Sequence, residues 1–373
     1  MSGSDLPSQG RSRAEAFSDS EALRLFGDLL SVPSPSGREQ RLADRIEQLL
    51  RELGYEPEHD VAGNLLVATG PRGPAEHPCV IAAHIDEIGA VVTSVAEDGS
   101  LRLGPSGGLH PWKLGECPVE VLGDGASVIG VFSMGSTHGL RDGDSGRAVG
   151  WDEVRVITGL SARQLAERGI RPGAQAVPAA FVRGPVVFGD EADPLVAAWT
   201  FDDRMGVVTL LRVLKALRDE RLQPASATIF AFTVHEESGG EGAKWLAAQV
   251  RPSAFVAVDG CPILDSAPLE LDGRPGIWMK DRLVHYSHAL IDALAEAACA
   301  AGTELQRGTY EATLSDASAV RSVGAAAQVA CFGHVRANSH GYEIARLSVF
   351  DNVYMTLRNF VRSWAGPPSA IAH

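Results

Sequence analysis

The sequence predicts an α/β fold, in which a doubly wound sheet with helices on both faces is interrupted by a small β-rich domain. Two observations indicate this fold class. Short apolar segments alternate with segments of helical period near the N-terminus and again after Trp199, which is the pattern of a mostly parallel sheet with crossover helices. Between these regions, from about Val92 to Asp193, short β-type segments alternate with Gly and Pro turns, as expected for an inserted β domain.

The N-terminal region is expected to form two helices followed by two strands. Amphipathic helices are predicted over Ser20 to Leu30 and over Glu39 to Leu53, because their apolar residues recur at the helical period. The apolar runs from Asn64 to Ala68 and from Cys79 to Ala83 have the length and β-branched content of buried strands.

The inserted region is predicted to be almost entirely β, with one helix from Ser161 to Gly169. Its β-type segments are Leu101 to Leu103, Pro118 to Leu122, Ser127 to Phe132, Val154 to Thr158 and Ala176 to Val182. Strand and helix then alternate again. Strands are expected at Ala227 to Val234, Ala254 to Val258 and Gln328 to Phe332, and helices at Met205 to Arg218, Gly242 to Gln249, His285 to Ala301 and Leu347 to Ser363.

The length of 373 residues suits two domains better than one compact core. We expect residues 20–92 and 194–373 to form the α/β domain, and residues 93–193 to form the insertion. Residues 1–19 are polar, are rich in Ser and Gly near their start, and lack the apolar core of a signal peptide. A flexible N-terminus and a cytoplasmic location are therefore expected.

Composition argues against several functional classes. The formal net charge of −14 makes the phosphate backbone of a nucleic acid an unfavourable partner. No stretch approaches the ~18 consecutive apolar residues that span a membrane. The five cysteines have no CxxC spacing, which argues against a disulfide framework and against a cysteine-ligated zinc site.

Four polar motifs lie where predicted strands end or where the following helix begins. They are His84-Ile85-Asp86, Asp202-Asp203, Glu236-Glu237 and Asp259. Because ligands of open α/β sheets bind outside the carboxyl ends of the strands, we expect these side chains to converge on one crevice.

Each motif alone has an ordinary explanation, such as a surface pair, a helix N-cap, a solvated face or a turn. Together, however, several carboxylates in one crevice would repel one another strongly unless a cation neutralised them. Zinc accepts imidazole nitrogen and carboxylate oxygen, and two metals ~3.5–4 Å apart can share one carboxylate and one water. The sequence therefore predicts a two-metal hydrolytic site.

Two further expectations concern the neighbours of the ligands. Asp86 follows His84 by two residues, so it can accept the second ring N–H and fix the tautomer. Adjacent residues of a strand point in opposite directions, so Glu236 and Glu237 should divide their roles. One would bind metal and the other would act as general base.

In this order, the motifs resemble the glutamyl and tetrahedral (TET) aminopeptidase family of co-catalytic two-metal metallopeptidases, some of which were once described as endoglucanases. The resemblance extends over most of the chain and implies a doubly wound zinc-peptidase-type catalytic domain. The matching segments include Gly63-Asn64-Leu65-Leu66, Ala83-His84-Ile85-Asp86-Glu87-Ile88-Gly89, Phe201-Asp202-Asp203-Arg204-Met205-Gly206, Thr233-Val234-His235-Glu236-Glu237, Val258-Asp259 and Ser315-Asp316-Ala317.

The resemblance implies a role for each residue of the site. His84 and Asp259 are the expected terminal ligands of the two metals, and Asp202 is the bridging carboxylate. Glu237 is the expected further ligand and Glu236 the general base.

The resemblance also implies that Asp86 orients His84 and that a histidine near the C-terminus is the last ligand. In the family that histidine stands four residues before a glutamate, within Arg-Tyr-x-His. Here His340 stands three residues before Glu343, and the usual tyrosine and proline are missing. His340 is the expected ligand, with His334 as the competing candidate.

The implied function is a metal-dependent aminopeptidase that cleaves the N-terminal amide bond of peptides. Two divalent metal ions per chain are expected, zinc first, with cobalt or manganese as alternatives. A two-metal deacylase acting on an N-acyl amino acid or a small specialised amide is the alternative. The family also implies a β-barrel-like dimerisation domain between the first two ligand motifs and a homo-oligomer, from a dimer up to a dodecamer.

Overall fold

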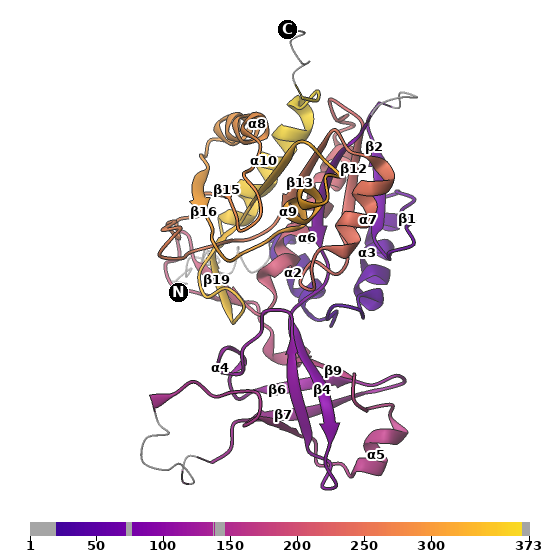
Figure 1. Cartoon of the computed structure of the whole chain (residues 1–373). Helices are drawn as coiled ribbons and strands as arrows, with labels where there is room; N and C mark the ends of the chain where they lie inside the picture. Colours follow the sequence, from indigo (N-terminus) through magenta and orange to yellow (C-terminus); the bar gives the residue numbers. More distant parts are fainter. Residues whose placement is uncertain (1–19, 72–76, 137, 139–145, 368–373) are drawn as a thin grey trace, which may run out of the picture.

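The computed structural model describes residues 20–71, 77–136, 138 and 146–367. Residues 1–19, for which a flexible N-terminus is expected, lie outside this part of the chain. Figure 1 shows an α/β body and, below it, a β body that the chain enters through β4 (Gly89–Val95) and leaves through β9 (Gln175–Pro178). The predicted fold class, α/β with an inserted barrel-like domain, is confirmed.

The α/β body is built on one eight-stranded sheet with the order β1-β2-β12-β3-β13-β17-β15-β16. The strands are β1 (Glu58–His59), β2 (Leu65–Thr69), β12 (Thr228–Thr233), β3 (Cys79–His84), β13 (Ala254–Val258), β17 (Val329–Gly333), β15 (Gly276–Lys280) and β16 (Gln306–Thr309). The four central strands, β12, β3, β13 and β17, are parallel, whereas β2 and β15 pair with them antiparallel. The carboxyl ends of the four central strands therefore lie at the same edge of the sheet.

Helices cover both faces of this sheet, and every residue of β3, β13 and β17 is therefore buried. Among these helices, α10 packs on α8 and α6, α2 packs on α6, and α7 packs on α9. The helices are α2 (Glu21–Leu30), α3 (Gln40–Glu52), α6 (Phe201–Asp219), α7 (Glu241–Val250), α8 (His288–Ala300), α9 (Asp316–Ser322) and α10 (Val349–Ser363). Burial on both faces explains why the central strands are continuous apolar runs in the sequence.

The inserted body is a closed barrel with the order β4-β5-β8-β7-β6-β9. Its other strands and helices are β5 (Leu101–Ser106), α4 (Pro111–Leu114), β6 (Pro118–Leu122), β7 (Ser127–Ser133), β8 (Arg155–Ile157) and α5 (Ala162–Glu167). The barrel has its own hydrophobic core, which includes Val121, Phe132 and Val156. Since β4 begins at Gly89, the barrel starts slightly before residue 93; the domain limits expected at 93 and 193 stay predictions.

Two smaller sheets are formed by segments that precede or follow the residues of the site. One contains β10 (Val186–Phe188), β11 (Leu195–Ala198) and β19 (Glu343–Arg346), and the other contains β14 (Cys261–Pro262) and β18 (Val335–Arg336). In the first sheet, Ala198 pairs with Glu343. This pairing brings the C-terminal segment beside the chain that leads into α6.

Several predicted element limits were wrong. The strand expected at Leu101 to Leu103 continues to Ser106. The strand expected to reach Val182 ends at Pro178, because proline cannot donate to the ladder, and a 3₁₀ turn follows. The range of helix α6 starts at Phe201, but Asp202 and Asp203 have non-helical dihedrals, so its regular part begins close to the predicted Met205. Helix α8 begins at His288 because His285 instead forms a β-bridge with Lys280. Among the described helices, none combines the length and apolar character that spanning a bilayer requires.

Candidate metal centre

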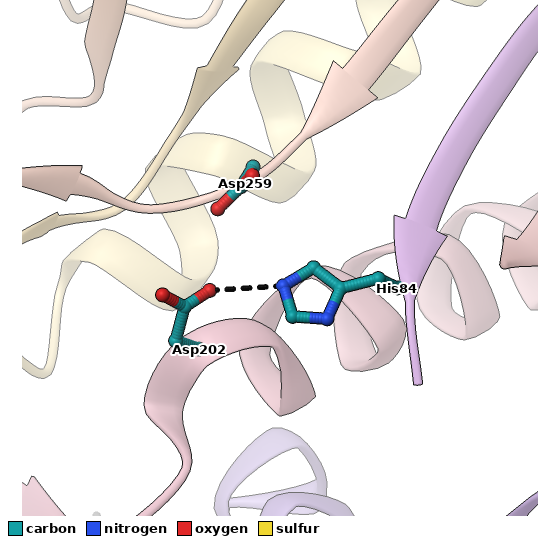
Figure 2. Close-up of side chains that lie close together, drawn as sticks. All are labelled: His84, Asp202 and Asp259. Atoms are coloured by element: carbon teal, nitrogen blue, oxygen red, sulfur yellow. Dashed lines mark hydrogen bonds and ion pairs between the residues drawn. The ribbon is translucent and has the colours of Figure 1, made fainter. Parts of the chain in front are cut away.

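The polar motifs gather at the carboxyl edge of the central sheet. His84 is the last residue of β3, Asp259 follows β13 directly, and Glu236 and Glu237 follow β12 after two intervening residues. Asp202 approaches from the first turn of α6. Figure 2 shows the side chains of His84, Asp202 and Asp259 pointing toward one another from these three elements.

The donor atoms fall into overlapping groups. In the first group, atoms of His84, Asp202 and Asp259 lie within 4.8 Å of one another, and His84 Nε2 lies 3.1 Å from Asp202 Oδ1. In the second group, His340 Nε2 lies 3.8 Å from both Asp202 Oδ2 and Glu237 Oε2. Asp202 belongs to both groups, and its two carboxylate oxygens face different partners.

Glu236 has a different position from Glu237. It forms a donor group with His84 and Glu237, but it is absent from the two groups that contain Asp202. The two glutamates follow His235, which has a φ of 60°. This left-handed residue turns the chain sharply after β12, so that consecutive glutamates meet different partners.

Asp86 connects His84 with the glutamate segment. Its Oδ1 accepts a hydrogen bond from the backbone N–H of Glu236 at 2.9 Å and lies 3.4 Å from His84 Nδ1. Its Oδ2 accepts from the backbone N–H of Glu237 at 3.1 Å and from Ser36 Oγ at 2.6 Å. The Asp86 side chain is fully buried. The carboxylate thus fixes the backbone of both glutamates, and the backbone carbonyl of Asp86, 3.1 Å from His84 Nδ1, is the hydrogen-bond partner of the imidazole ring.

The two aspartates of the α6 motif differ in function within the structure. Asp203 Oδ1 accepts a hydrogen bond from the backbone N–H of Gly206 at 3.0 Å, which satisfies a free donor at the start of the helix. Asp202 instead faces the donor groups, and its own N–H donates to Glu343 Oε2 at 3.0 Å. The helix-cap explanation therefore holds for Asp203 alone.

Three carboxyl groups of the site have raised pKa values, because they are buried and lie close to other acids. Burial, with a contribution from the nearby Asp202 carboxylate, raises the pKa of Glu237 to about 7 and that of Asp259 to about 8. Burial also raises the pKa of Glu236 well above its usual range. Glu237 Oε1 has no hydrogen-bond partner among the described residues. This donor set fits a divalent cation, which would offset the repulsion between the carboxylates and would be coordinated by Glu237 Oε1.

Two members of the site have opposite shifts. Although burial by itself lowers the pKa of His84, hydrogen bonds to Asp202 and Asp86 raise it well above its usual value. Burial tends to raise the pKa of Asp202, but the guanidinium of Arg336 and the ring of His84 hold it well below the usual range. Asp202 is therefore ionised at neutral pH.

The structure brings His340 into the donor groups and leaves His334 outside them. His334 is fully buried, its ring lies 5.6 Å from that of Phe201, and neither ring nitrogen has a hydrogen-bond partner in the described chain. Burial and the charge of Arg336 lower its pKa to about 3. His334 is a neutral packing residue here, and the metal-ligand role of His340 stays a prediction.

The sequence pattern missed two residues next to Asp202. The guanidinium of Arg336 is buried, forms an ion pair with the Asp202 carboxylate, and lies 2.8 Å from Glu343 Oε1 through Nε. Glu343 was expected only as the family's companion to the last histidine. An arginine three residues beyond the end of β17 was a visible signal, because that strand is one of the four that end at this edge.

A cavity of about 610 Å³ opens beside the donor groups. Its lining includes residues of α7, of the turn after β15 and of the segment before α9, together with the site residues Asp202, Glu236, Glu237, Asp259, Arg336 and His340. Such a cavity is large enough for a small peptide substrate.

Sequence comparison identifies the family. The profile of the M42 glutamyl aminopeptidase family matches residues 63–355. A glutamyl aminopeptidase of Lactococcus lactis is 29% identical over 241 residues, which cover 64% of this chain and 66% of that protein, just under two thirds. A lysyl aminopeptidase of Pyrococcus furiosus is 28% identical over 238 residues, which cover 63% of this chain and 65% of that protein.

Solved structures of aminopeptidases have a similar fold. The TET1 peptidase of Pyrococcus horikoshii, which can assemble into a tetrahedron or a large octahedral shell, matches with a TM-score of 0.79 and 25% identity, covering 92% of this chain and 100% of that one. An aminopeptidase of Desulfurococcus kamchatkensis matches with a TM-score of 0.79 and 25% identity, covering 92% and 95%. Because the family profile covers well over half of its 373 residues, this chain belongs to the M42 glutamyl aminopeptidase family of peptidases.

Proposed function

We propose that this chain is a metal-dependent aminopeptidase that hydrolyses the N-terminal amide bond of peptides. The observation that supports this most directly is the pair of donor groups that share Asp202. His84 and Asp259 would hold one ion together with Asp202, and Glu237 and His340 would hold the second. Zinc, cobalt and manganese all accept imidazole and carboxylate donors, with zinc as our first expectation.

A bound metal pair supplies Lewis acidity toward a carbonyl oxygen and lowers the pKa of water. The chain supplies the proton transfers. Glu236 lies in the crevice without being needed as a shared ligand, and burial raises its pKa well above its usual range. It would take a proton from the attacking water and return it to the leaving amine. Asp86 would keep His84 in one orientation and Glu236 within reach.

The decisive experiment combines a substrate panel with a base variant. Aminoacyl amides and their N-acylated counterparts are supplied to the protein loaded separately with zinc, cobalt and manganese. Turnover of free-amine substrates alone supports the aminopeptidase, whereas turnover of the blocked amides alone would identify a deacylase. Glu236→Gln should lose at least about a hundredfold in kcat, in line with a general base, while its metal content stays at two ions per chain.

Glu296→Gln, on the exposed surface of α8, is the matched control and should keep full activity. Full turnover by Glu236→Gln would contradict the proposed role of that residue. Wild-type protein that binds two metals but hydrolyses neither class of amide would contradict the proposed function itself.

We also propose that the chain forms a homo-oligomer through its barrel. Ile129, Val131 and Ile157 are each about half exposed, and Val131 pairs directly with Ile157 across β7 and β8. Adjacent exposed apolar side chains of this kind are typical of an interface. Light scattering should give a mass above that of one chain, and Val131→Glu should lower it.

The relatives leave open which charge the N-terminal residue of the substrate carries. The names of the two enzymes, glutamyl and lysyl aminopeptidase, refer to N-terminal residues of opposite charge. The charge preference of this chain therefore depends on the residues that line its own cavity.

A further inference from the structure

The lining of the cavity combines two electrostatically different sets of residues. The carboxylates of the candidate metal centre form one set. The other set comes from α7, from the turn after β15 that contains Arg282 and Leu283, and from residues 312–315. A substrate whose scissile amide lies at the metal centre shares the cavity with this second set.

In the second set, one positive charge is compensated and one is not. Lys244 Nζ lies 3.2 Å from Glu241 Oε1, so these two charges pair with each other. Arg282 is exposed and, within the described part of the chain, its guanidinium has neither an ion pair nor a hydrogen bond. The second set of lining residues thus includes one uncompensated positive charge.

The turn that contains Arg282 is firmly held. The fully buried Asp281 accepts hydrogen bonds from the backbone N–H groups of Leu283 at 2.8 Å and Val284 at 2.9 Å, and from Tyr286 Oη at 2.7 Å. Tyr286 Oη also lies 2.8 Å from Ser315 Oγ, and Ser315 lines the cavity. The backbone of the turn is therefore fixed beside the cavity lining, so the side chain of Arg282 starts from a fixed point of the backbone.

We propose that Arg282, which lines the same cavity as the candidate metal centre, is a specificity-determining residue that binds a carboxylate of the substrate. A guanidinium suits this task because it is always charged and matches a carboxylate with two parallel N–H donors. The inference rests on the proposed aminopeptidase function. Two substrate groups have this chemistry: the side chain of an N-terminal Glu or Asp, and the terminal carboxyl of a dipeptide.

The positive charge of Arg282 disfavours substrates with a basic N-terminal residue. An N-terminal lysine would bring its ammonium toward Arg282, and Glu241 is already engaged by Lys244. Like charges at close range raise the free energy of binding. The cavity should therefore discriminate against basic N-terminal residues.

The test uses two pairs of nearly isosteric substrates that differ in one carboxylate. Glu-p-nitroanilide is compared with Gln-p-nitroanilide, and Ala-Ala with Ala-Ala-amide. In the wild type, kcat/KM should favour the carboxylate member of at least one pair by about tenfold or more, the size expected for a charge-assisted hydrogen bond. A preference in the first pair identifies the side chain as the carboxylate source, and a preference in the second identifies the terminal carboxyl.

Arg282→Gln should remove that preference while leaving kcat/KM for the neutral member within about twofold, and Arg282→Glu should reverse it. Arg307→Gln, which changes an exposed arginine on β16 outside the cavity lining, is the control and should keep the wild-type preference. A wild type without preference in either pair, or a preference that survives Arg282→Gln, would overturn the proposal.

A binding measurement keeps the proposal independent of turnover. Calorimetric titrations of the metal-loaded protein compare L-glutamate with L-glutamine, and L-alanine with L-alaninamide. If no amide is hydrolysed, the proposed function fails, yet tighter binding of a carboxylate member that disappears in Arg282→Gln still supports carboxylate recognition. Equal binding within both pairs would refute it.

Discussion

Replacing Asp86 with asparagine tests the connection between His84 and the glutamate segment. The side chain keeps its size, but one of its two oxygens becomes an amide NH₂ group. In the native structure each oxygen accepts one backbone N–H, from Glu236 or from Glu237. Whichever way the amide is turned, one of these buried N–H groups then faces another donor.

The magnitude follows from that loss. A buried donor without a partner costs about 1–3 kcal/mol, which corresponds to about 5- to 150-fold in an equilibrium constant. Ser36 can adapt, because its hydroxyl can accept as well as donate, and so it adds little. We therefore expect Asp86→Asn to weaken metal binding by about 10- to 100-fold, the range typical for residues that orient metal ligands.

The assay is a competition titration of zinc between the protein and a chelating dye, with circular dichroism to confirm folding. Asp98→Asn is the control, because Asp98 also accepts a backbone N–H and a serine hydroxyl, both from Ser100, but in an exposed barrel turn. The control should bind zinc like the wild type. If Asp86→Asn also binds both metals with unchanged affinity, Asp86 does not position the site.

Two further predictions concern pH and buried charge. The raised pKa values of Glu237 and Asp259, about 7 and about 8, mean that the folded metal-free protein holds protons that the unfolded chain releases near pH 4. Stability of the metal-free form should therefore fall as pH rises from 5 to 8, and the gain in thermal midpoint on adding zinc should grow; a gain independent of pH would contradict this. Glu87 is buried between Arg183 at 3.0 Å and Arg204 at 3.6 Å. Glu87→Gln should lower the free energy of unfolding by about 3–5 kcal/mol in denaturant titrations, and a loss below about 1 kcal/mol would contradict that estimate.

The long periodic elements and buried central strands were predictable because burial on both faces makes a strand a continuous apolar run. Strand β16 was not. It consists of Gln306–Thr309 at the edge of the sheet, and its polar sequence contains no apolar run. It extends because β15 offers a partner in parallel register, which is a tertiary cause that local sequence does not contain.

The same distinction separates the predicted and the missed parts of the site. His84, Asp259 and the two glutamates follow strands whose carboxyl ends must meet once the sheet is parallel, so their convergence follows from topology. Arg336 reaches Asp202 through a contact across 134 residues. No spacing rule encodes such a contact, because it depends on how β17 continues into β18 after the sheet has formed.

The spacing of His340 and Glu343 differs from the family pattern, yet the ring of His340 lies in a donor group with Asp202 and Glu237. The histidine stands one place nearer the glutamate than the family pattern implies, and both Asn338 and His340 have positive φ values, 62° and 57°. These left-handed residues turn the ring of His340 toward Asp202 and Glu237. The ring then lies so close to Gly108 that a Cβ atom there would be 2.5 Å from Nδ1. Because Gly108 lies in the inserted region between β5 and α4, the barrel restricts where this histidine can sit, and the site depends on the insertion as well as on the sheet.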